Sequence, residues 1–226
     1  GSVVFMLFRQ GWRWEECGSQ IALSGEGLVA TKSAKSADNT TWNLVTGGSP
    51  MTEGRHYWEV ELTAGHHSMV GAVRPGLDHD KSHDRTNDAY FIDWYDGSLF
   101  GNGKRNADPQ GPFATGDRIG VLLDLDAGWM RLYRNGKRCG PGFTEGVTGP
   151  LVRAAQLFMK GDKVTALPAA VAPEGAGEEG EFAVFVDYGT YSLAQLKDAC
   201  RAKGLPVGGT KAVLRARLEA AALPPQ

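Results

Sequence analysis

The sequence predicts a mainly β protein, in which one antiparallel β-sandwich is followed by a short helical segment. From Tyr57 to Leu62, apolar and polar side chains alternate strictly, and a period of two is typical of a half-buried strand. Two further apolar runs are joined by a turn at Ala127-Gly128, and Asn135-Gly136 follows the second run. This dipeptide favours a type I′ hairpin because both residues tolerate positive φ. After Gly189 the apolar period changes to 3.6, which indicates helices.

The length of 226 residues allows one large β-sandwich, or a sandwich with something small beside it. A hydrophobic content of 42% and a charged content of 22% are ordinary for a soluble globular protein. No apolar run approaches the roughly 20 residues that a membrane-spanning helix needs. The three cysteines are far apart and form no Cys-x-x-Cys, which disfavours a disulfide framework or a zinc site and favours a reducing compartment.

Apolar runs bounded by Gly, Pro, Asn and Asp predict the strands. In chain order they lie at 3–14, 21–31 (two short strands, or a strand and a turn), 42–45, 57–62, 69–73, 90–95, 99–100, 118–134 (two strands), 151–164 (a pair) and 182–189. Two polar loops interrupt them, at 32–41 and 74–88.

Residues 168–181 differ in composition from everything before them. They contain no aromatic residue and are rich in Ala, Gly, Pro and Glu, so they bury too little surface to order themselves. We therefore expect a flexible insertion or linker there, with 182–189 as the last strand of the sandwich.

Several of these blocks resemble the SPRY domain. The resemblance is carried by Trp42, Gly54-Arg-His-Tyr-Trp-Glu-Val, Val70-Gly-Ala-Val, Gly116-Asp-Arg-Ile-Gly-Val-Leu-Leu-Asp-Leu-Asp, Leu132-Tyr-Arg-Asn-Gly-Lys and Phe185-Val-Asp-Tyr-Gly. It implies a SPRY-like bent antiparallel β-sandwich over residues 3–189, used to bind proteins and not as an enzyme. The long loop at 74–88 and the insertion at 168–181 depart from the family pattern.

Family members that hold short peptides use loops at one end of the sandwich. By that analogy, the resemblance implies a protein- or peptide-binding surface formed by Lys32, Lys35, Arg74, Phe158, Met159 and Lys160, with further positions in the 78–88 loop. The alternative is structural: Phe158 belongs to the core, and Arg74 pairs with a neighbouring aspartate.

The C-terminal segment predicts two short helices. Ser192 and Gln195 have capping-box spacing, Gly204 fits the left-handed position that ends a helix, and Thr210 caps the second helix. The apolar faces are formed by Leu193, Leu196 and Cys200 in the first helix, and by Val213, Leu214 and Leu218 in the second.

From 191 to 220 the sequence closely resembles the SAP domain of scaffold-attachment factors, which implies a helical domain at 190–223 that binds DNA or RNA. The residues that we expect to contact nucleic acid are Lys197, Arg201, Lys203, Gly208, Gly209, Thr210, Lys211 and Arg215.

Physical chemistry agrees with this implication. A helix start with two glycines offers free amides to a phosphate. Residues 190–226 carry a net charge of +4, while the rest of the chain carries −6. We therefore expect residues 190–226 to be the part that binds a polyanion. The alternative is that these charges only form a solvated helix face.

Three other groups suggest no chemistry. Asp78–Asp84 has metal-capable side chains, but in a polar loop without helical spacing. His66 and His67 would lie on alternate faces of a strand end. Asp124 and Asp126 have no third partner for acid–base work. We therefore expect no catalytic residue, no metal and no cofactor.

The sequence thus predicts a non-enzymatic adaptor whose SPRY domain binds a protein or peptide and whose SAP domain binds DNA or RNA. No membrane and no small-molecule substrate is expected. The same two modules occur together, in the opposite order, in the heterogeneous nuclear ribonucleoprotein U-like proteins, which suggests an intracellular, nuclear location. The alternative is a pure protein-interaction scaffold, such as an assembly factor or a ubiquitin-ligase adaptor, whose SAP helices pack on protein.

Overall fold

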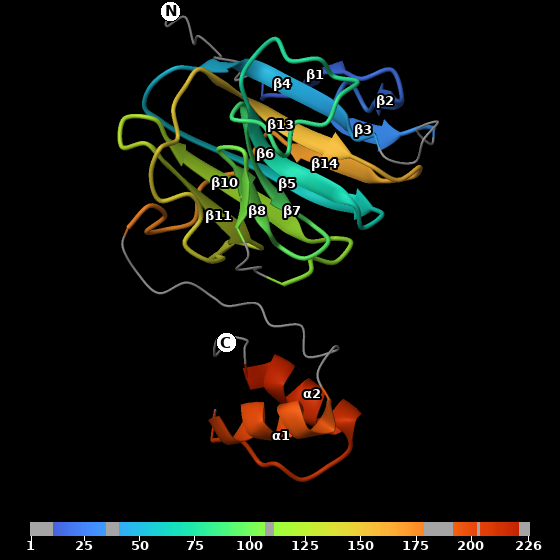
Figure 1. The fold of residues 1–226 in the computed structure, drawn as a ribbon, viewed down its shortest axis with the longest axis vertical. Coiled ribbons are helices and arrows are strands. Elements are labelled where there is room, and N and C mark those ends of the chain that lie inside the picture. Colours follow the sequence, from blue (N-terminus) through green and yellow to red (C-terminus); the bar gives the residue numbers. More distant parts are fainter. Residues whose placement is uncertain (1–10, 35–40, 107–110, 179–191, 203, 222–226) are drawn as a thin grey trace, which may run out of the picture. The chain divides into compact units, whose positions relative to one another are not determined.

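The computed structural model describes residues 11–34, 41–106, 111–178, 192–202 and 204–221. The chain divides into two units, residues 1–184 and residues 185–226, which we call the sandwich unit and the helical unit (Figure 1).

The described part of the sandwich unit contains two antiparallel sheets (Figure 1). The first has the order β1 (Trp14–Cys17), β4 (Asn43–Met51), β13 (Leu151–Leu157), β6 (Ser68–Val73), β7 (Ala89–Asp93), β8 (Leu99–Gly101) and β9 (Lys104–Asn106). The second has the order β12 (Lys137–Arg138), β11 (Trp129–Arg134), β10 (Arg118–Asp124), β5 (Arg55–Ala64), β14 (Lys163–Leu167), β3 (Val29–Lys32) and β2 (Ile21–Ser24). The predicted mainly β fold is confirmed.

The two strongest sequence patterns form the centre of the second sheet. The alternating residues Trp58, Val60 and Leu62 of β5 are all buried, and Val121 of β10 lies opposite Trp58. At the turn between β11 and β12, Asn135 and Gly136 have φ values of 51° and 79°. This is the pair of positive angles that a type I′ turn requires.

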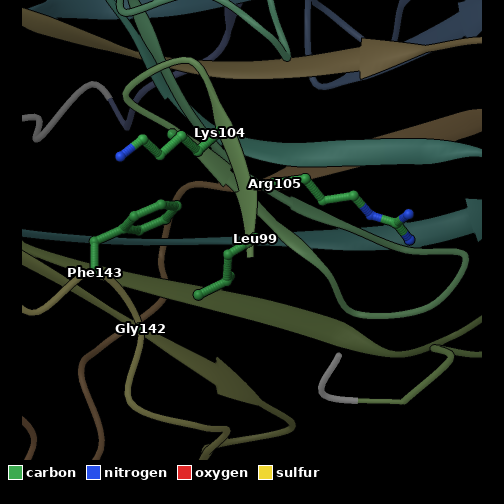
Figure 2. Close-up of a pocket in the computed structure, with 6 residues that line it drawn as sticks. Leu99, Lys104, Arg105, Gly142 and Phe143 are labelled. Carbon is green, nitrogen blue, oxygen red and sulfur yellow. The ribbon is translucent and has the colours of Figure 1, made fainter. Parts of the chain in front are cut away.

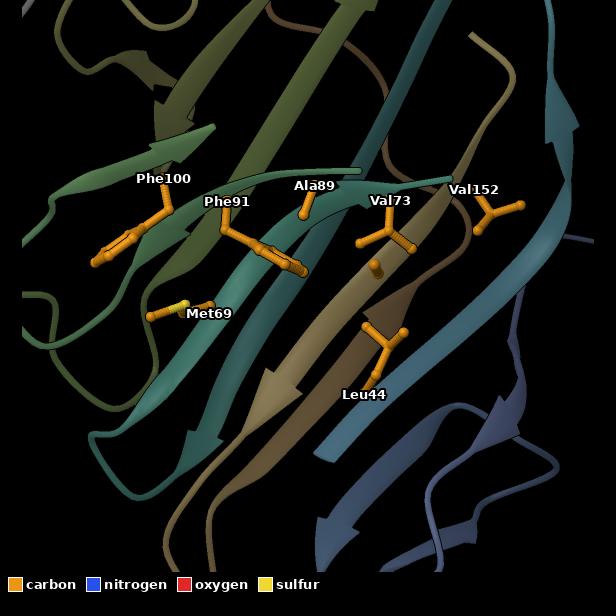
Figure 3. Packing of buried hydrophobic residues seen from close by; sticks show 8 residues of the cluster. Leu44, Met69, Val73, Ala89, Phe91, Phe100 and Val152 are labelled. Carbon is orange, nitrogen blue, oxygen red and sulfur yellow. The ribbon is translucent and has the colours of Figure 1, made fainter. Parts of the chain in front are cut away.

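In the first sheet, β6 and β7 are buried along their whole length. Figure 3 shows one layer of this packing, in which side chains from five strands share one face: Leu44, Met69, Val73, Ala89, Phe91, Phe100, Val152 and Ala154. Leu77, from the loop between β6 and β7, packs against this layer, and the His83 amide of the same loop donates to Oε1 of buried Gln156 at 2.8 Å. The long polar loop is thus anchored on the sheet.

Most of the predicted strands are present. Residues 21–31 form two strands, β2 and β3, and the first strand of the described chain begins at Trp14. Residues 3–10 and the predicted closing strand at 182–189 lie outside the described residues, as does the predicted domain boundary at 189/190.

The segment predicted to be flexible has a described part, 168–178, with specific contacts to β11. Arg131 donates to the Glu178 carbonyl at 2.8 Å, and the Gly177 amide donates to the Tyr133 hydroxyl at 3.1 Å. Composition alone does not reveal these contacts, because the segment contributes backbone groups and the sheet contributes the side chains.

The helical unit contains α1 (Leu193–Ala202) and α2 (Lys211–Ala221). Both start signals are present: Ser192 and Gln195 exchange the two bonds of a capping box, and the first backbone bond of α2 runs from Leu214 to Thr210. Gly204, with φ of 66°, follows α1 in the left-handed conformation. No helix among the described residues is long and apolar enough to cross a membrane.

Candidate functional site

Aromatic side chains from four separate segments meet on the surface of the sandwich unit. Trp42 stacks on Phe158 with ring centroids 5.0 Å apart, and His67 lies edge-on to Phe158 at 5.7 Å. Tyr95 is 56% exposed and Met159 is 41% exposed, so this cluster reaches solvent. We call it the aromatic patch; its members are Trp42, His66, His67, Tyr95, Phe158 and Met159.

The patch depends on one buried carboxylate. Asp162 is 1% exposed and accepts hydrogen bonds from the Met159 amide at 2.8 Å and from the His66 amide at 3.3 Å. These amides belong to different turns, one between β13 and β14 and the other between β5 and β6. Burial raises the pKa of Asp162, an effect that its backbone hydrogen bonds oppose. Asp162 therefore fixes the two turns to each other.

The expectation that His66 and His67 point to opposite faces is wrong. Strand β5 ends at Ala64, Gly65 has φ of 89°, and both histidines lie in the turn, where strand alternation does not apply. Their rings are 5.1 Å apart and tilted by 33°, and His67 also lies 4.8 Å from the Tyr95 ring. Burial, and secondly His66, lower the pKa of His67, which favours the neutral form of its ring.

The predicted peptide-binding residues do not all lie on one surface in the structure. Phe158 is half-buried and lies in the aromatic patch with exposed Met159, while Lys160 follows them and is exposed. Lys32 has to be removed from the predicted surface: it is 1% exposed, and its ammonium donates to the side chain of Asn43. Lys35 lies outside the described residues.

Arg74 has the structural role that was the alternative to peptide binding. It donates to the Gly149 carbonyl at 3.1 Å and to the Thr148 hydroxyl at 2.9 Å, and its Nε lies 3.7 Å from Asp88. It therefore holds two loops together.

Polar side chains of the loop at 78–88 form hydrogen bonds with other parts of the sandwich and within the loop. Asp80 accepts from the Ser19 amide at 2.6 Å and from Asn43 at 2.8 Å, and a ring nitrogen of His83 lies 2.7 Å from the Asp78 carbonyl. Across the described residues, no group of three or more His, Cys, Asp or Glu side chains is arranged to hold a metal ion.

The helical unit has its own small core, in which Leu196, Cys200, Leu214 and Leu218 are fully buried. The predicted basic residues surround it: Lys211 and Arg215 are exposed, Lys197 is partly buried, and Arg201 pairs with Asp198. Lys203 lies outside the described residues.

The glycine corner before α2, formed by Gly208 and Gly209, is exposed. A Cβ atom added at Gly208 would meet nothing within 4 Å, whereas at Gly209, where φ is 125°, it would lie 2.8 Å from Val213. Arg217, which is not among the residues expected to bind nucleic acid, donates to the carbonyls of Pro206 and Gly208.

A recess of about 280 Å³ lies beside the edge strand β9 (Figure 2). In Figure 2, Lys104 and Arg105 extend in opposite directions from this strand above Leu99 and Phe143. Arg105 is paired with Asp96. The recess is lined by Leu99, Gly101, Lys104, Arg105, Gly142 and Phe143, which include no carboxylate, histidine or hydroxyl group.

Asp124 and Asp126 also have structural roles. Asp124 forms an ion pair with Arg55 at 2.5 Å, and Asp126 accepts from the Gly54 amide at 2.9 Å.

Comparison with known proteins agrees with this architecture. The family model "SPRY domain" matches residues 55–168, and "SAP domain" matches residues 187–222; both describe binding domains and not catalytic families. No curated protein matches the chain.

Among solved structures, the chain is similar to the SPRY domain of human HERC1 (TM-score 0.58, 22% identity, covering 71% of this chain and 99% of that one). It is also similar to the PSpry domain of TRIM65 (TM-score 0.57, 17% identity, covering 70% and 92%). At these identities the likeness concerns the fold alone. The predicted order of the two domains is confirmed: the chain belongs to the SPRY family and carries a SAP domain after its SPRY domain.

Proposed function

We propose that this protein is a non-enzymatic adaptor. Its SPRY domain binds a protein or peptide at the aromatic patch, its SAP domain binds the phosphate backbone of DNA or RNA, and it works in the nucleus. The observation that carries the proposal is the separation of two surfaces of different chemistry, one aromatic and one basic, on two different binding domains.

The aromatic patch suits a partner that inserts an apolar side chain. Binding is favoured when a partner covers large apolar side chains on a protein surface, and aromatic anchors contribute most of the binding energy of many interfaces. Because Asp162 already fixes the two turns, little backbone ordering is needed on binding.

The SPRY half is tested by capturing proteins from a nuclear extract with the full chain and with two variants. Phe158→Ala and Met159→Ala should lose the captured protein, while Lys137→Ala, in the short strand β12, should retain it. A partner that both patch variants retain would contradict the location of the site.

The SAP half rests on the charge of the helical unit and on its exposed corner. Each neutralised phosphate releases counterions, so the logarithm of the affinity should fall with the logarithm of the salt concentration with a slope of about −0.9 per contact on duplex DNA. With roughly four to six contacts, binding should be weak and strongly salt-dependent.

The test is a titration of the full chain against a labelled AT-rich duplex and a labelled single-stranded RNA at several salt concentrations. Lys211→Ala and Arg215→Ala should each weaken binding and make the salt slope shallower. Lys163→Ala, a loss of the same charge in the sandwich unit, should change neither. Absence of binding to both probes would contradict the SAP half.

A pure scaffold is the second candidate, and one observation favours it. Leu193 and Val213 of the helical unit are 44% and 45% exposed, and apolar side chains of this size can pack on another protein. In that case Leu193→Ser and Val213→Ser would release a bound protein, while Lys211→Ala would have no effect.

A further inference from the structure

The clearest unassigned feature of the helical unit is the side chain of Arg217. It lies on α2, seven residues after the cap Thr210, and helical side chains lean toward the helix N-terminus. Nη1 of Arg217 donates to the Gly208 carbonyl at 3.1 Å and also to the Pro206 carbonyl. One guanidinium group thus holds two carbonyls of the turn that leads into the helix.

These two bonds fix the orientation of the corner. In a planar trans peptide, the carbonyl of one residue and the amide of the next point in opposite directions. Because Arg217 holds the Gly208 carbonyl, the Gly209 amide is directed away from Arg217. Among the described residues, no hydrogen bond is donated by that amide.

The same bonds change the local electrostatics. A carbonyl oxygen that faced the start of α2 would place partial negative charge where a phosphate should bind. Because Arg217 engages these oxygens, the electrostatic potential at the start of α2 is set by the positive end of the helix dipole and by the amides there.

The glycines fit this role. Gly209 has φ of 125° and lacks room for a Cβ atom against Val213, so only glycine allows this orientation of its peptide without strain.

We propose that Arg217 is a positioning residue for nucleic-acid binding: it orients the peptide between Gly208 and Gly209 so that the Gly209 amide faces a backbone phosphate, and it does not contact the phosphate itself. The inference rests on the proposed function of the SAP domain and adds a division of roles within it. Lys211 and Arg215 supply charge to the phosphate, whereas Arg217 acts on the protein backbone.

The test compares Arg217→Gln and Arg217→Lys with Arg215→Gln in the full chain, using the labelled duplex and a series of salt concentrations. Arg217→Gln should bind about tenfold more weakly with an unchanged salt slope, because the lost bonds are charge-assisted bonds within the protein. Arg217→Lys should be weakened about fivefold, because an ammonium group lacks the planar fork. Arg215→Gln should make the slope shallower by about 0.9, as expected for one lost phosphate contact.

A second readout needs no nucleic acid. In the free, ¹⁵N-labelled full chain, the Gly209 amide resonance should shift in both Arg217 variants and stay in place in Arg215→Gln. Helical circular dichroism should be unchanged in all three variants, which separates positioning from a loss of the fold.

The possible failures are distinguishable. If the natural sequence binds neither duplex nor RNA, the proposed function fails and this inference fails with it. If the natural sequence binds, but Arg217→Lys binds equally well or Arg217→Gln changes the salt slope as Arg215→Gln does, only the positioning role is overturned.

Discussion

We expect Asp93, the last residue of β7, to make the free energy of unfolding of the sandwich unit depend on pH. This side chain is 8% exposed, and burial raises its pKa to about 6, helped by the nearby carboxylates of Asp96 and Asp84. The Tyr95 amide, which donates to it at 2.9 Å, and Arg105 act in the opposite direction without cancelling the shift. The folded protein therefore binds the Asp93 proton more tightly than the unfolded chain does.

The sign and size of the effect follow from linkage. Between pH 3.8 and about 6 the folded state holds more protons than the unfolded state, so the free energy of unfolding decreases as the pH rises through this window. A shift from 3.8 to about 6 corresponds to about 3 kcal/mol at about 1.36 kcal/mol per pKa unit. This penalty is complete above the folded value and nearly absent below pH 4.

The perturbation is Asp93→Asn, which removes the charge and keeps an oxygen that can accept from the Tyr95 amide. We expect the variant to be more stable than the natural sequence by about 2–3 kcal/mol at pH 7.5, and by less than about 1 kcal/mol at pH 4. Urea denaturation followed by tryptophan fluorescence measures this, because all six tryptophans lie between residues 12 and 129 and report on the sandwich unit alone.

Asp78→Asn is the matched control. Asp78 is exposed, and hydrogen bonds from the Asp80 amide and from Lys81 lower its pKa. Its replacement should therefore change stability at pH 7.5 in the opposite direction. Equal stability of Asp93→Asn and the natural sequence at pH 7.5, or a difference that does not vary with pH, would refute the assignment of a buried, destabilising carboxylate at Asp93.

Three further outcomes test other parts of the structure. Asp162→Ala removes an acceptor from two part-buried turn amides and should lower the free energy of unfolding of the sandwich unit by about 1–3 kcal/mol in the same urea assay; a loss below about 0.5 kcal/mol, the usual range for surface substitutions, would count against its role. Gly71→Ala would place a Cβ atom 1.9 Å from the Tyr90 carbonyl, so we expect insoluble or unfolded sandwich, whereas Gly208→Ala, with open space around it, should remain folded. Leu214→Ala should unfold the helical unit, because about 2–5 kcal/mol exceeds what so small a core provides; helical circular dichroism should fall while tryptophan fluorescence stays constant.

The strands and helices were largely predictable because their signals are local. The alternation at Tyr57–Leu62, the Asn135-Gly136 turn and the Ser192–Gln195 capping box each specify a structure within a few residues. The structure has β5, the β11–β12 turn and α1 at these positions.

The candidate site was less predictable because it depends on contacts between distant segments. The polar composition of 32–41 indicates a loop, yet Lys32 is the end of β3 and lies buried beside Asn43. Trp42 and Tyr95 carry no individual signal for a binding surface; only the folded chain places them near Phe158 and His67. The turn residue Gly65 is a local signal that the strand ends before the two histidines, so strand alternation does not apply to them.

The shared attachment of two turns to Asp162 has a consequence for how this surface tolerates change over evolution. Substitutions at solvent-facing positions of either turn alter which side chains are presented, while the backbone beneath them keeps its shape as long as the carboxylate and its amide donors remain. Such a surface can acquire new partners by exchanging a few side chains, without the rest of the sandwich having to adapt.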